Sequence, residues 1–120
     1  MVKVLVIEDE PDLRELLVDE LEHAGYEIAE ACDGVEGLAT IKAQEPDVIV
    51  SDIGMPRMDG YELRRKLQDC ARFRKTPFMF VSAYPPQNAI VEGIDVEAID
   101  YFTKPVDFDS LLARIETIAA

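Results

Sequence analysis

The chain has 120 residues, of which 48% are hydrophobic and 31% are charged, a size and balance typical of one soluble globular domain spanning residues 1–120. Twelve basic residues against 25 acidic ones give a formal net charge of −13, which disfavours direct binding to nucleic acid or to anionic lipid. No apolar run approaches the roughly 20 residues of a bilayer span, and no signal peptide precedes the first strand-like segment. We therefore expect a cytoplasmic protein.

The residue types that bind transition metals are sparse. Cys32 and Cys70 lie far apart without metal-ligand spacing, which predicts reduced, structural thiols. His23 is the only histidine and falls near the end of a predicted helix. A zinc or redox site therefore has no support, and a histidine-dependent catalytic triad is excluded.

Strand and helix patterns alternate along the whole chain. A strand is predicted over residues 3–7, and it is followed by a helix with Pro11 in its first turn and Gly25 at its left-handed C-terminal cap. Further strands are predicted over 27–31, 48–51, 78–81 and 98–102, and further helices over 35–44, 60–69, 88–95 and 109–118. Five such βα units with short connections predict an α/β doubly wound fold, with helices on both faces of a five-stranded parallel sheet.

Polar residues follow four of the five predicted strands. Glu8 and Asp9 come after the first strand, Asp52 after the third, Ser82 after the fourth and Lys104 after the fifth. In an open parallel sheet, ligands bind outside the carboxyl ends of the strands. These side chains are therefore predicted to share one functional edge.

Three converging carboxylates repel one another, so they must either bind protons or neutralise their charge with a cation. Oxygen ligands favour Mg²⁺, which takes one or two carboxylates and keeps its other positions for water and phosphate. This predicts Asp9 and Asp52 as direct ligands and Glu8 as a ligand through water. The backbone carbonyl of Gly54 is a candidate for one further ligand.

A carboxylate can also attack phosphorus and form an aspartyl phosphate, if the charge of the transferring group is compensated. Mg²⁺ and Lys104 would compensate that charge beside Asp52. Ser82 offers a hydroxyl donor to a phosphoryl oxygen, and that bond would draw the loop after the fourth strand inward. The pattern thus predicts a switch driven by phosphorylation.

Four segments carry a distinctive run of residues. They read Val-Leu-Val-Ile-Glu-Asp-Glu at 4–10, Asp-Ile-Gly-Met-Pro-Arg-Met-Asp-Gly at 52–60, Val-Ser-Ala at 81–83 and Asp-Tyr-Phe-Thr-Lys-Pro at 100–105. In order and spacing they resemble the receiver domain of two-component response regulators, including chemotaxis regulators, over essentially the whole chain. The resemblance implies a flavodoxin-like, three-layer fold with strand order 2-1-3-4-5.

The resemblance also implies a role for each site residue. It makes Asp52 the phosphoacceptor, Glu8 and Asp9 the Mg²⁺ ligands, Ser82 the switch hydroxyl, Lys104 the partner of the phosphoryl group and Tyr101 the switch aromatic, with a cis peptide bond before Pro105. An aromatic residue in a strand also packs, and for Tyr101 both roles can coexist.

Some positions set this chain apart from the family pattern. Gly54 and Tyr84 stand two residues past the acceptor and the switch hydroxyl, where the family's rates are tuned. Gly54 is expected to leave open space beside the phosphoryl group, and Tyr84 to cover it in part. Pro85 and Pro86 restrict the loop that follows. Glu97 replaces a usual glycine, so the turn before the last strand is expected to differ.

As partners, the resemblance implies a histidine kinase or a histidine phosphotransfer protein, with small acyl phosphates as substitute donors. The chain would be a signalling module rather than an enzyme, either alone or as the first domain of a regulator with an output domain. Asp95, Asp100 and Arg114 resemble part of an ion-pair set through which some regulators form homodimers on the face of the fourth helix, fifth strand and fifth helix. Ile90 stands where those regulators tend to carry arginine.

Two other functions remain open from the sequence. A Mg²⁺-dependent phosphohydrolase or phosphotransferase acting on a small molecule can also use an aspartyl nucleophile. Such an enzyme usually needs a general acid and an enclosing insert, and residues 53–59 supply neither clearly. The other alternative is a receiver-like binding module that is never phosphorylated.

Overall fold

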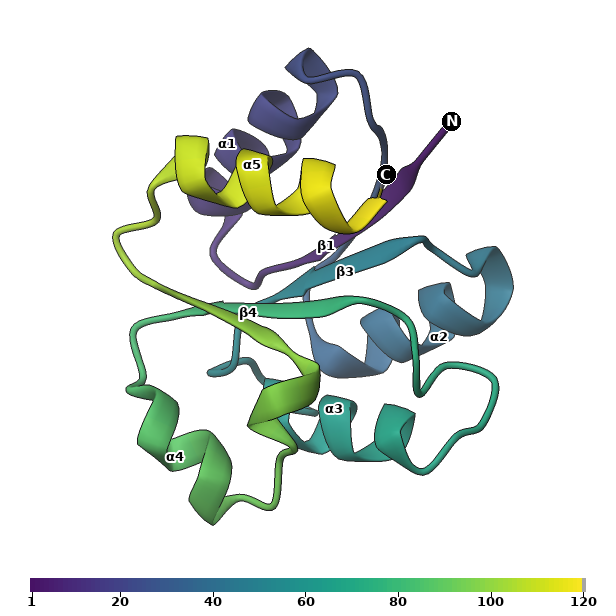
Figure 1. Cartoon of the computed structure of the whole chain (residues 1–120), viewed down its shortest axis with the longest axis vertical. Helices are drawn as coiled ribbons and strands as arrows, with labels where there is room; N and C mark the ends of the chain where they lie inside the picture. Colours follow the sequence, from purple (N-terminus) through teal and green to yellow (C-terminus); the bar gives the residue numbers. More distant parts are fainter. Residues whose placement is uncertain (120) are drawn as a thin grey trace.

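The computed structural model of the chain describes residues 1–119. Within that range five strands and five α-helices alternate, with one short 3-10 turn before the last strand (Figure 1). The strands are β1 (Lys3–Ile7), β2 (Glu27–Ala31), β3 (Val48–Ser51), β4 (Phe78–Ser82) and β5 (Asp100–Thr103), the helices are α1 (Pro11–His23), α2 (Gly34–Gln44), α3 (Gly60–Gln68), α4 (Pro86–Val91) and α5 (Phe108–Ala119), and the 3-10 turn is η1 (Val96–Ala98).

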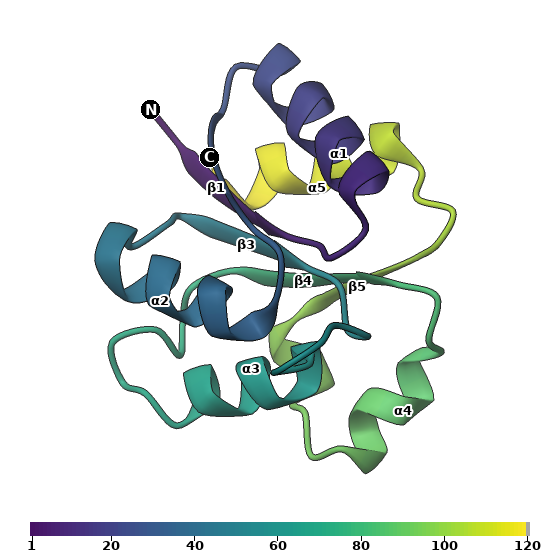
Figure 2. The ribbon, with the colours of Figure 1, turned by 180° about the vertical axis from the view of Figure 1, so that it is seen from behind.

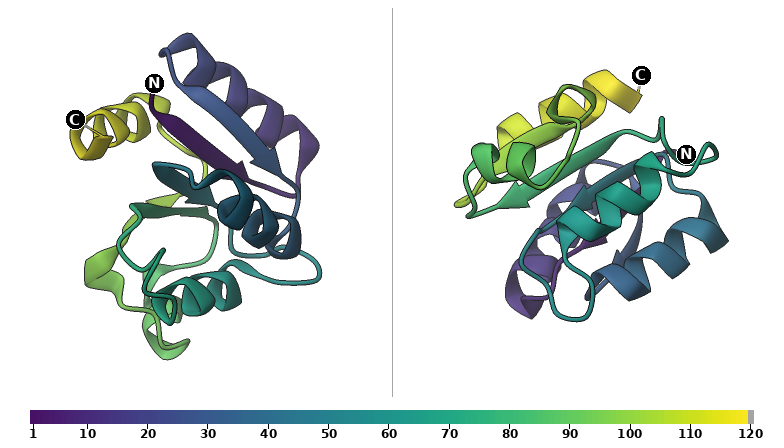
Figure 3. Two further views of the ribbon diagram at one scale, coloured as in Figure 1. Left: turned by 90° about the vertical axis from the view of Figure 1, so that its right-hand side faces the viewer. Right: turned by 90° about the horizontal axis from the view of Figure 1, so that it is seen from below.

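All strand pairings are parallel, and the strand order is β2-β1-β3-β4-β5. Helices α1 and α5 cover one face of the sheet, while α2, α3 and α4 lie on the other (Figures 1 and 3). The predicted doubly wound, flavodoxin-like fold with three layers is confirmed.

The alternation of side chains along β1 explains why helices cover both faces. Val4 and Val6 pack in a core with residues of α1 and α5, whereas Leu5 and Ile7 pack in a second core with residues of α2 and α3. All four side chains are at most 1% exposed. A strand that is apolar on both faces is stable only as the centre of a three-layer structure, because successive side chains point to opposite sides.

Helix ends largely follow their local sequence. Gly25 has φ +97 just past α1, as predicted for a left-handed cap. Asp33 begins α2 and Asp59 begins α3, each with its carboxylate accepting a hydrogen bond from an amide in the first turn. None of the helices among residues 1–119 is long and apolar enough to cross a membrane.

The prediction for the fourth helix was wrong in position and length. We predicted residues 88–95, but α4 spans Pro86–Val91. Pro86 is tolerated in the first turn, so the helix begins earlier. It ends early because Gly93 adopts a left-handed φ of +80. The Asp95 carboxylate then accepts a hydrogen bond from the Glu97 amide and begins η1, so β5 starts two residues later than predicted.

Candidate functional site

The register of the sheet brings the predicted acids together. Ile7 of β1 is paired with Ser51 of β3, so the residues that follow them, Glu8 and Asp52, are neighbours at the carboxyl edge. The Asp52 amide donates to the Ile7 carbonyl at 2.9 Å. Carboxylate oxygens of Glu8, Asp9 and Asp52 all lie within 4.8 Å of one another. The structure thus forms the acidic cluster that the sequence predicted.

Lys104 follows the last residue of β5 and reaches this cluster from there. Its amide donates to the Ser82 carbonyl at 3.0 Å, which fixes the backbone at the ends of β4 and β5. Its Nζ lies 3.0 Å from Asp52 Oδ2 and 3.1 Å from Glu8 Oε1. The peptide bond between Lys104 and Pro105 is cis, as the resemblance implied. One ammonium group therefore contacts two buried carboxylates.

The Asp52 carboxylate is held by a contact at each oxygen. It is mostly buried; Oδ1 accepts a hydrogen bond from the Ile53 amide at 2.7 Å, and Oδ2 accepts one from Lys104. The backbone behind it is closely packed, because a Cβ on Gly60 would lie 2.4 Å from the Asp52 carbonyl oxygen. Asp52 is thus fixed in orientation before any ligand binds.

The surroundings of Glu8 disfavour the charged form of its carboxyl group. Glu8 is 1% exposed, and Oε2 accepts a hydrogen bond from the Glu10 amide at 3.1 Å. Burial, and after it the charge of Asp52, raises the pKa of Glu8 to about 7, although the Glu10 amide and Lys104 oppose this shift. Burial disfavours the charged form of Lys104, but its contacts with Asp52 and Glu8 outweigh this and raise its pKa.

The donor set fits a hard divalent cation. Three carboxylates face one ammonium group, so the cluster has an excess of negative charge. Glu8 Oε1 is buried and accepts no hydrogen bond, even though the Lys104 ammonium lies close by. Asp9 is open to solvent, which leaves a route for an ion and its water ligands. Oxygen-only ligands of this kind suit Mg²⁺.

Ser82 and Tyr101 are linked through the backbone of Tyr84. The buried Ser82 Oγ accepts a hydrogen bond from the Tyr84 amide at 3.1 Å, and the Tyr101 hydroxyl donates to the Tyr84 carbonyl. The Tyr101 ring also packs edge-on against Phe80, with 5.9 Å between centroids. Packing and hydrogen bonding therefore coexist at Tyr101.

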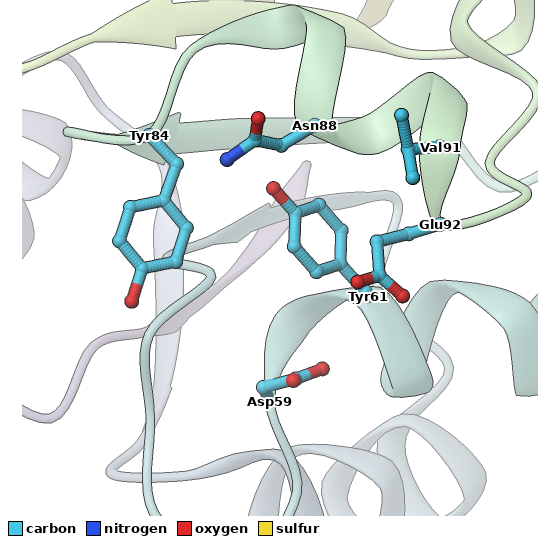
Figure 4. A pocket seen from close by; sticks show the side chains of 6 residues that line it. All are labelled: Asp59, Tyr61, Tyr84, Asn88, Val91 and Glu92. Atoms are coloured by element: carbon cyan, nitrogen blue, oxygen red, sulfur yellow. The ribbon is translucent and has the colours of Figure 1, made fainter.

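The space expected beside Gly54 is occupied by Tyr84. A Cβ built on Gly54 would lie 2.8 Å from the Tyr84 Oη, so the tyrosine ring covers this glycine. The Tyr84 side chain also borders a hollow of about 350 Å³ between α3 and α4, which Tyr61 and Asn88 also line (Figure 4). Neither Asp52 nor any other residue of the acidic cluster lines this hollow, so it does not enclose a substrate against the acids.

An ion pair between the exposed Arg57, in the loop after β3, and the buried carboxylate of Asp33 was not predicted from the sequence. Arg57 donates from Nε and Nη2 to Asp33 Oδ2, at 2.9 and 2.7 Å. Asp33 is 4% exposed, and a hydrogen bond from the Glu36 amide, followed by the Arg57 contacts, lowers its pKa. The Gly34 amide donates to the Met58 carbonyl at 3.1 Å. These contacts fasten the loop after β3 to the start of α2.

Of the two residues in this ion pair, only Asp33 has a structural role that its local sequence indicates. An Asp-Gly pair before an amphipathic segment indicates a helix cap at Asp33. Arg57 lies 24 residues away and adopts a left-handed φ of +68, a conformation that is unusual for arginine. Nothing local in the sequence predicts that contact.

Comparison with known proteins agrees with this geometry. The family model of the response regulator receiver domain matches residues 4–116. The chain is 37% identical over 117 residues to the response regulator MprA of Mycobacterium tuberculosis, and 33% identical over 118 residues to the DNA-binding dual master transcriptional regulator RpaA of Synechocystis sp.. Each alignment covers 98% of this chain but only 50% and 49% of those proteins. The chain thus spans about half the length of the curated relatives it matches.

Solved structures show the same relationship. The chemotaxis response regulator CheY4 of Vibrio cholerae aligns with a TM-score of 0.86 and 31% identity, covering 98% of both chains. The response regulator TrrA of Thermotoga maritima, solved in complex with Mg(2+)-BeF, aligns with a TM-score of 0.85 and 29% identity, covering 98% of this chain and 99% of that one. The chain therefore belongs to the response regulator receiver domain family and is a signalling domain of two-component systems rather than a classical enzyme.

Proposed function

We propose that this single receiver domain accepts a phosphoryl group on Asp52 in a Mg²⁺-dependent reaction in the cytoplasm. The donor is a histidine kinase or a histidine phosphotransfer protein, and small acyl phosphates substitute for it. The observation that carries the proposal is the meeting of three carboxylates and Lys104 at the carboxyl edge of the sheet. The relative TrrA, solved with Mg(2+)-BeF, supports the same assignment.

The metal-binding residues in this proposal are Asp9, Asp52 and, through water, Glu8, with the Gly54 carbonyl as one further ligand. Mg²⁺ would supply positive charge to the oxygens of the transferring phosphoryl group. The buried Glu8 Oε1, which accepts no hydrogen bond, supports a cation at this place. So does the raised pKa of Glu8, because burial and then the charge of Asp52 disfavour its ionised form even though the Lys104 ammonium lies 3.1 Å away.

The nucleophile is an oxygen of the Asp52 carboxylate. It forms a bond to phosphorus while the bond from phosphorus to the donor's imidazole nitrogen breaks, and the nitrogen leaves with the electron pair. The Ile53 amide holds Oδ1, so the carboxylate does not need to reorient. Lys104 already contacts Oδ2 and is placed to neutralise the incoming charge. Ser82 then donates its hydroxyl to a phosphoryl oxygen.

The output surface in this proposal is the face of α4, β5 and α5. Ile90 and Val91 of α4 are 61% and 86% exposed, which suits an apolar contact with a partner or an output domain. Asp100 and Arg114 form an ion pair within the chain at 2.9 Å. A homodimer through this face would use these charges between subunits. Sedimentation velocity with and without beryllofluoride tests for that dimer.

The main experiment measures the intact mass of the protein after incubation with acetyl phosphate and Mg²⁺. Wild type should gain the mass of one phosphoryl group, the gain should vanish with EDTA, and Asp52→Asn should gain nothing. Asp9→Asn should need more Mg²⁺ for the same yield. If wild type and Asp52→Asn behave alike, the phosphorylation chemistry is wrong and the fold serves a constitutive binding module.

A further inference from the structure

The charge of the molecule is unevenly distributed. Residues 64–75 contain six of the 12 basic residues and one of the 25 acidic residues, a net of +5 within a chain of −13. The other 108 residues therefore carry −18. Lys66, Arg72, Arg74 and Lys75 of this segment are exposed, and so is Lys42 on the neighbouring helix. An acidic molecule thus presents a cationic face at the end of α3 and the turn after it, next to Lys42 of α2.

This cationic face contains an apolar hollow. Helices α2 and α3 lie side by side on one face of the sheet (Figure 2). Between them is a space of about 290 Å³, lined by Leu38, Lys42, Lys66, Leu67, Cys70 and Phe73. Phe73 and Leu67 are buried, and Leu38 and Cys70 are partly buried, so the floor is apolar. The two lysines are exposed and flank it. We call this feature the α2–α3 groove.

The two lysines have no acidic partner in the part of the chain that the structure describes. Nearby cations do: Arg65 pairs with Glu92 at 3.3 Å, and Arg72 pairs with Glu45 at 2.8 Å. No ion pair of residues 1–119 includes Lys42 or Lys66. Their ammonium groups are therefore available to carboxylates from outside the chain.

We infer that the α2–α3 groove docks an acidic, amphipathic segment of a partner protein. A large apolar side chain of that segment fills the hollow, and its flanking carboxylates meet Lys42 and Lys66. Long polyanions such as nucleic acid fit this surface poorly. They extend beyond it, and the −18 on the rest of the chain repels them over the Debye length of roughly 8–10 Å. A short acidic segment avoids that repulsion.

The groove is separated from the phosphorylation site. The acidic cluster lies at the carboxyl ends of the strands, and α3 begins there at Gly60, next to the Asp52 backbone. The groove is lined by residues from the end of α3, Lys66 and Leu67, and from the turn that leads to the amino end of β4. Docking should therefore be independent of phosphorylation, unlike binding to the face of α4, β5 and α5. The inference goes beyond the proposed function and does not depend on it.

The test uses a fluorescein-labelled peptide, acetyl-EELFEE-amide, and measures its anisotropy as the full chain is added. Two control peptides remove one feature each: acetyl-QQLFQQ-amide lacks the charges and acetyl-EEGSEE-amide lacks the apolar side chains. The double variant K42E/K66E should weaken binding of the first peptide by about tenfold or more. The matched variant R74E/K75E has the same charge change on the same face but outside the groove, and it should weaken binding by less than about threefold.

Several results would overturn the inference. One is the absence of binding by wild type, and another is equal binding of the glutamine peptide or of the peptide without apolar residues. Equal losses in the two double variants would also overturn it, because they would indicate diffuse attraction of anions. Far-ultraviolet circular dichroism checks that both variants fold. Addition of Mg²⁺ and beryllofluoride should leave the peptide affinity unchanged, and a large change would contradict the independence from phosphorylation.

Discussion

Replacing Glu8 with glutamine should stabilise the metal-free protein at neutral and alkaline pH. Glu8 is buried, its Oε1 accepts no hydrogen bond, and its pKa is raised from the ordinary value of 4.5 to about 7. The folded state therefore binds this proton more tightly than the unfolded state does. Glutamine has nearly the same shape but does not ionise, so the variant avoids the cost of a buried charge beside Asp52.

The expected size follows from the two pKa values. A carboxyl with a raised pKa in the folded state weakens folding as the pH rises from its unfolded pKa to its folded pKa, here between 4.5 and about 7. At about 1.36 kcal/mol per pKa unit, wild type should lose roughly 2–3 kcal/mol relative to Glu8→Gln between about pH 5 and about pH 8. The difference should be small at the acid end and fully present above neutrality.

Urea unfolding in EDTA, followed by circular dichroism at a series of pH values, measures this difference directly. Adding Mg²⁺ at the alkaline end should raise the stability of wild type more than that of Glu8→Gln, because a bound cation replaces the missing positive charge. If the free energies of unfolding of the two proteins differ by the same amount at every pH from acid to alkaline, the raised pKa of Glu8 does not weaken folding, and the prediction is refuted. That outcome would mean that Glu8 is already neutralised by Lys104 in the folded state.

Three further substitutions test contacts that the structure reveals. Arg57→Ala should destabilise the protein more than Arg57→Gly, because both lose the ion pair with Asp33 but only glycine adopts the left-handed φ without strain; urea unfolding compares them. Arg64→Met should raise the free energy of unfolding by at least about 1 kcal/mol, since Arg64 is buried with Nε and Nη1 unpaired, and a loss of stability would instead imply a polar partner. A double-mutant cycle on Gly54→Ala and Tyr84→Ala should show strong coupling, because the three atoms nearest to the added methyl group all belong to the Tyr84 side chain, whereas additive effects would contradict that contact.

The sheet and the acidic cluster were predictable because both depend on short-range rules. Alternating apolar residues define the strands, and the order of strands and helices implies parallel pairing. Parallel pairing in turn places the residues after each strand at one edge, which is why Glu8, Asp52 and Lys104 could be grouped before any distance was known. Their convergence follows from register and does not require knowledge of side-chain packing.

Features that depend on side-chain direction were not predictable in this way. The buried guanidinium of Arg64 lies 5.3 Å from the Phe78 ring centroid, in a helix whose sequence indicates only an amphipathic pattern. A charged residue at such a position would normally be expected to face solvent. The ion pair between Arg57 and Asp33 likewise depends on how the loop after β3 folds back onto α2. Sequence spacing carries no information about either contact.

Contacts of Tyr84 link three of the predicted residues, Ser82, Tyr101 and Gly54, to one another. The amide of Tyr84 donates to Ser82, its carbonyl accepts from Tyr101, and its ring covers Gly54. A displacement of Ser82 toward a phosphoryl group must therefore either carry Tyr84 along or break a hydrogen bond to it. If Tyr84 moves, its carbonyl, which accepts the hydrogen bond from the Tyr101 hydroxyl, moves as well. The ring that covers Gly54 moves with it. The positions of Ser82, the Tyr101 hydroxyl and the cover over Gly54 are thus coupled through this one residue, whereas the sequence suggested separate effects at each position.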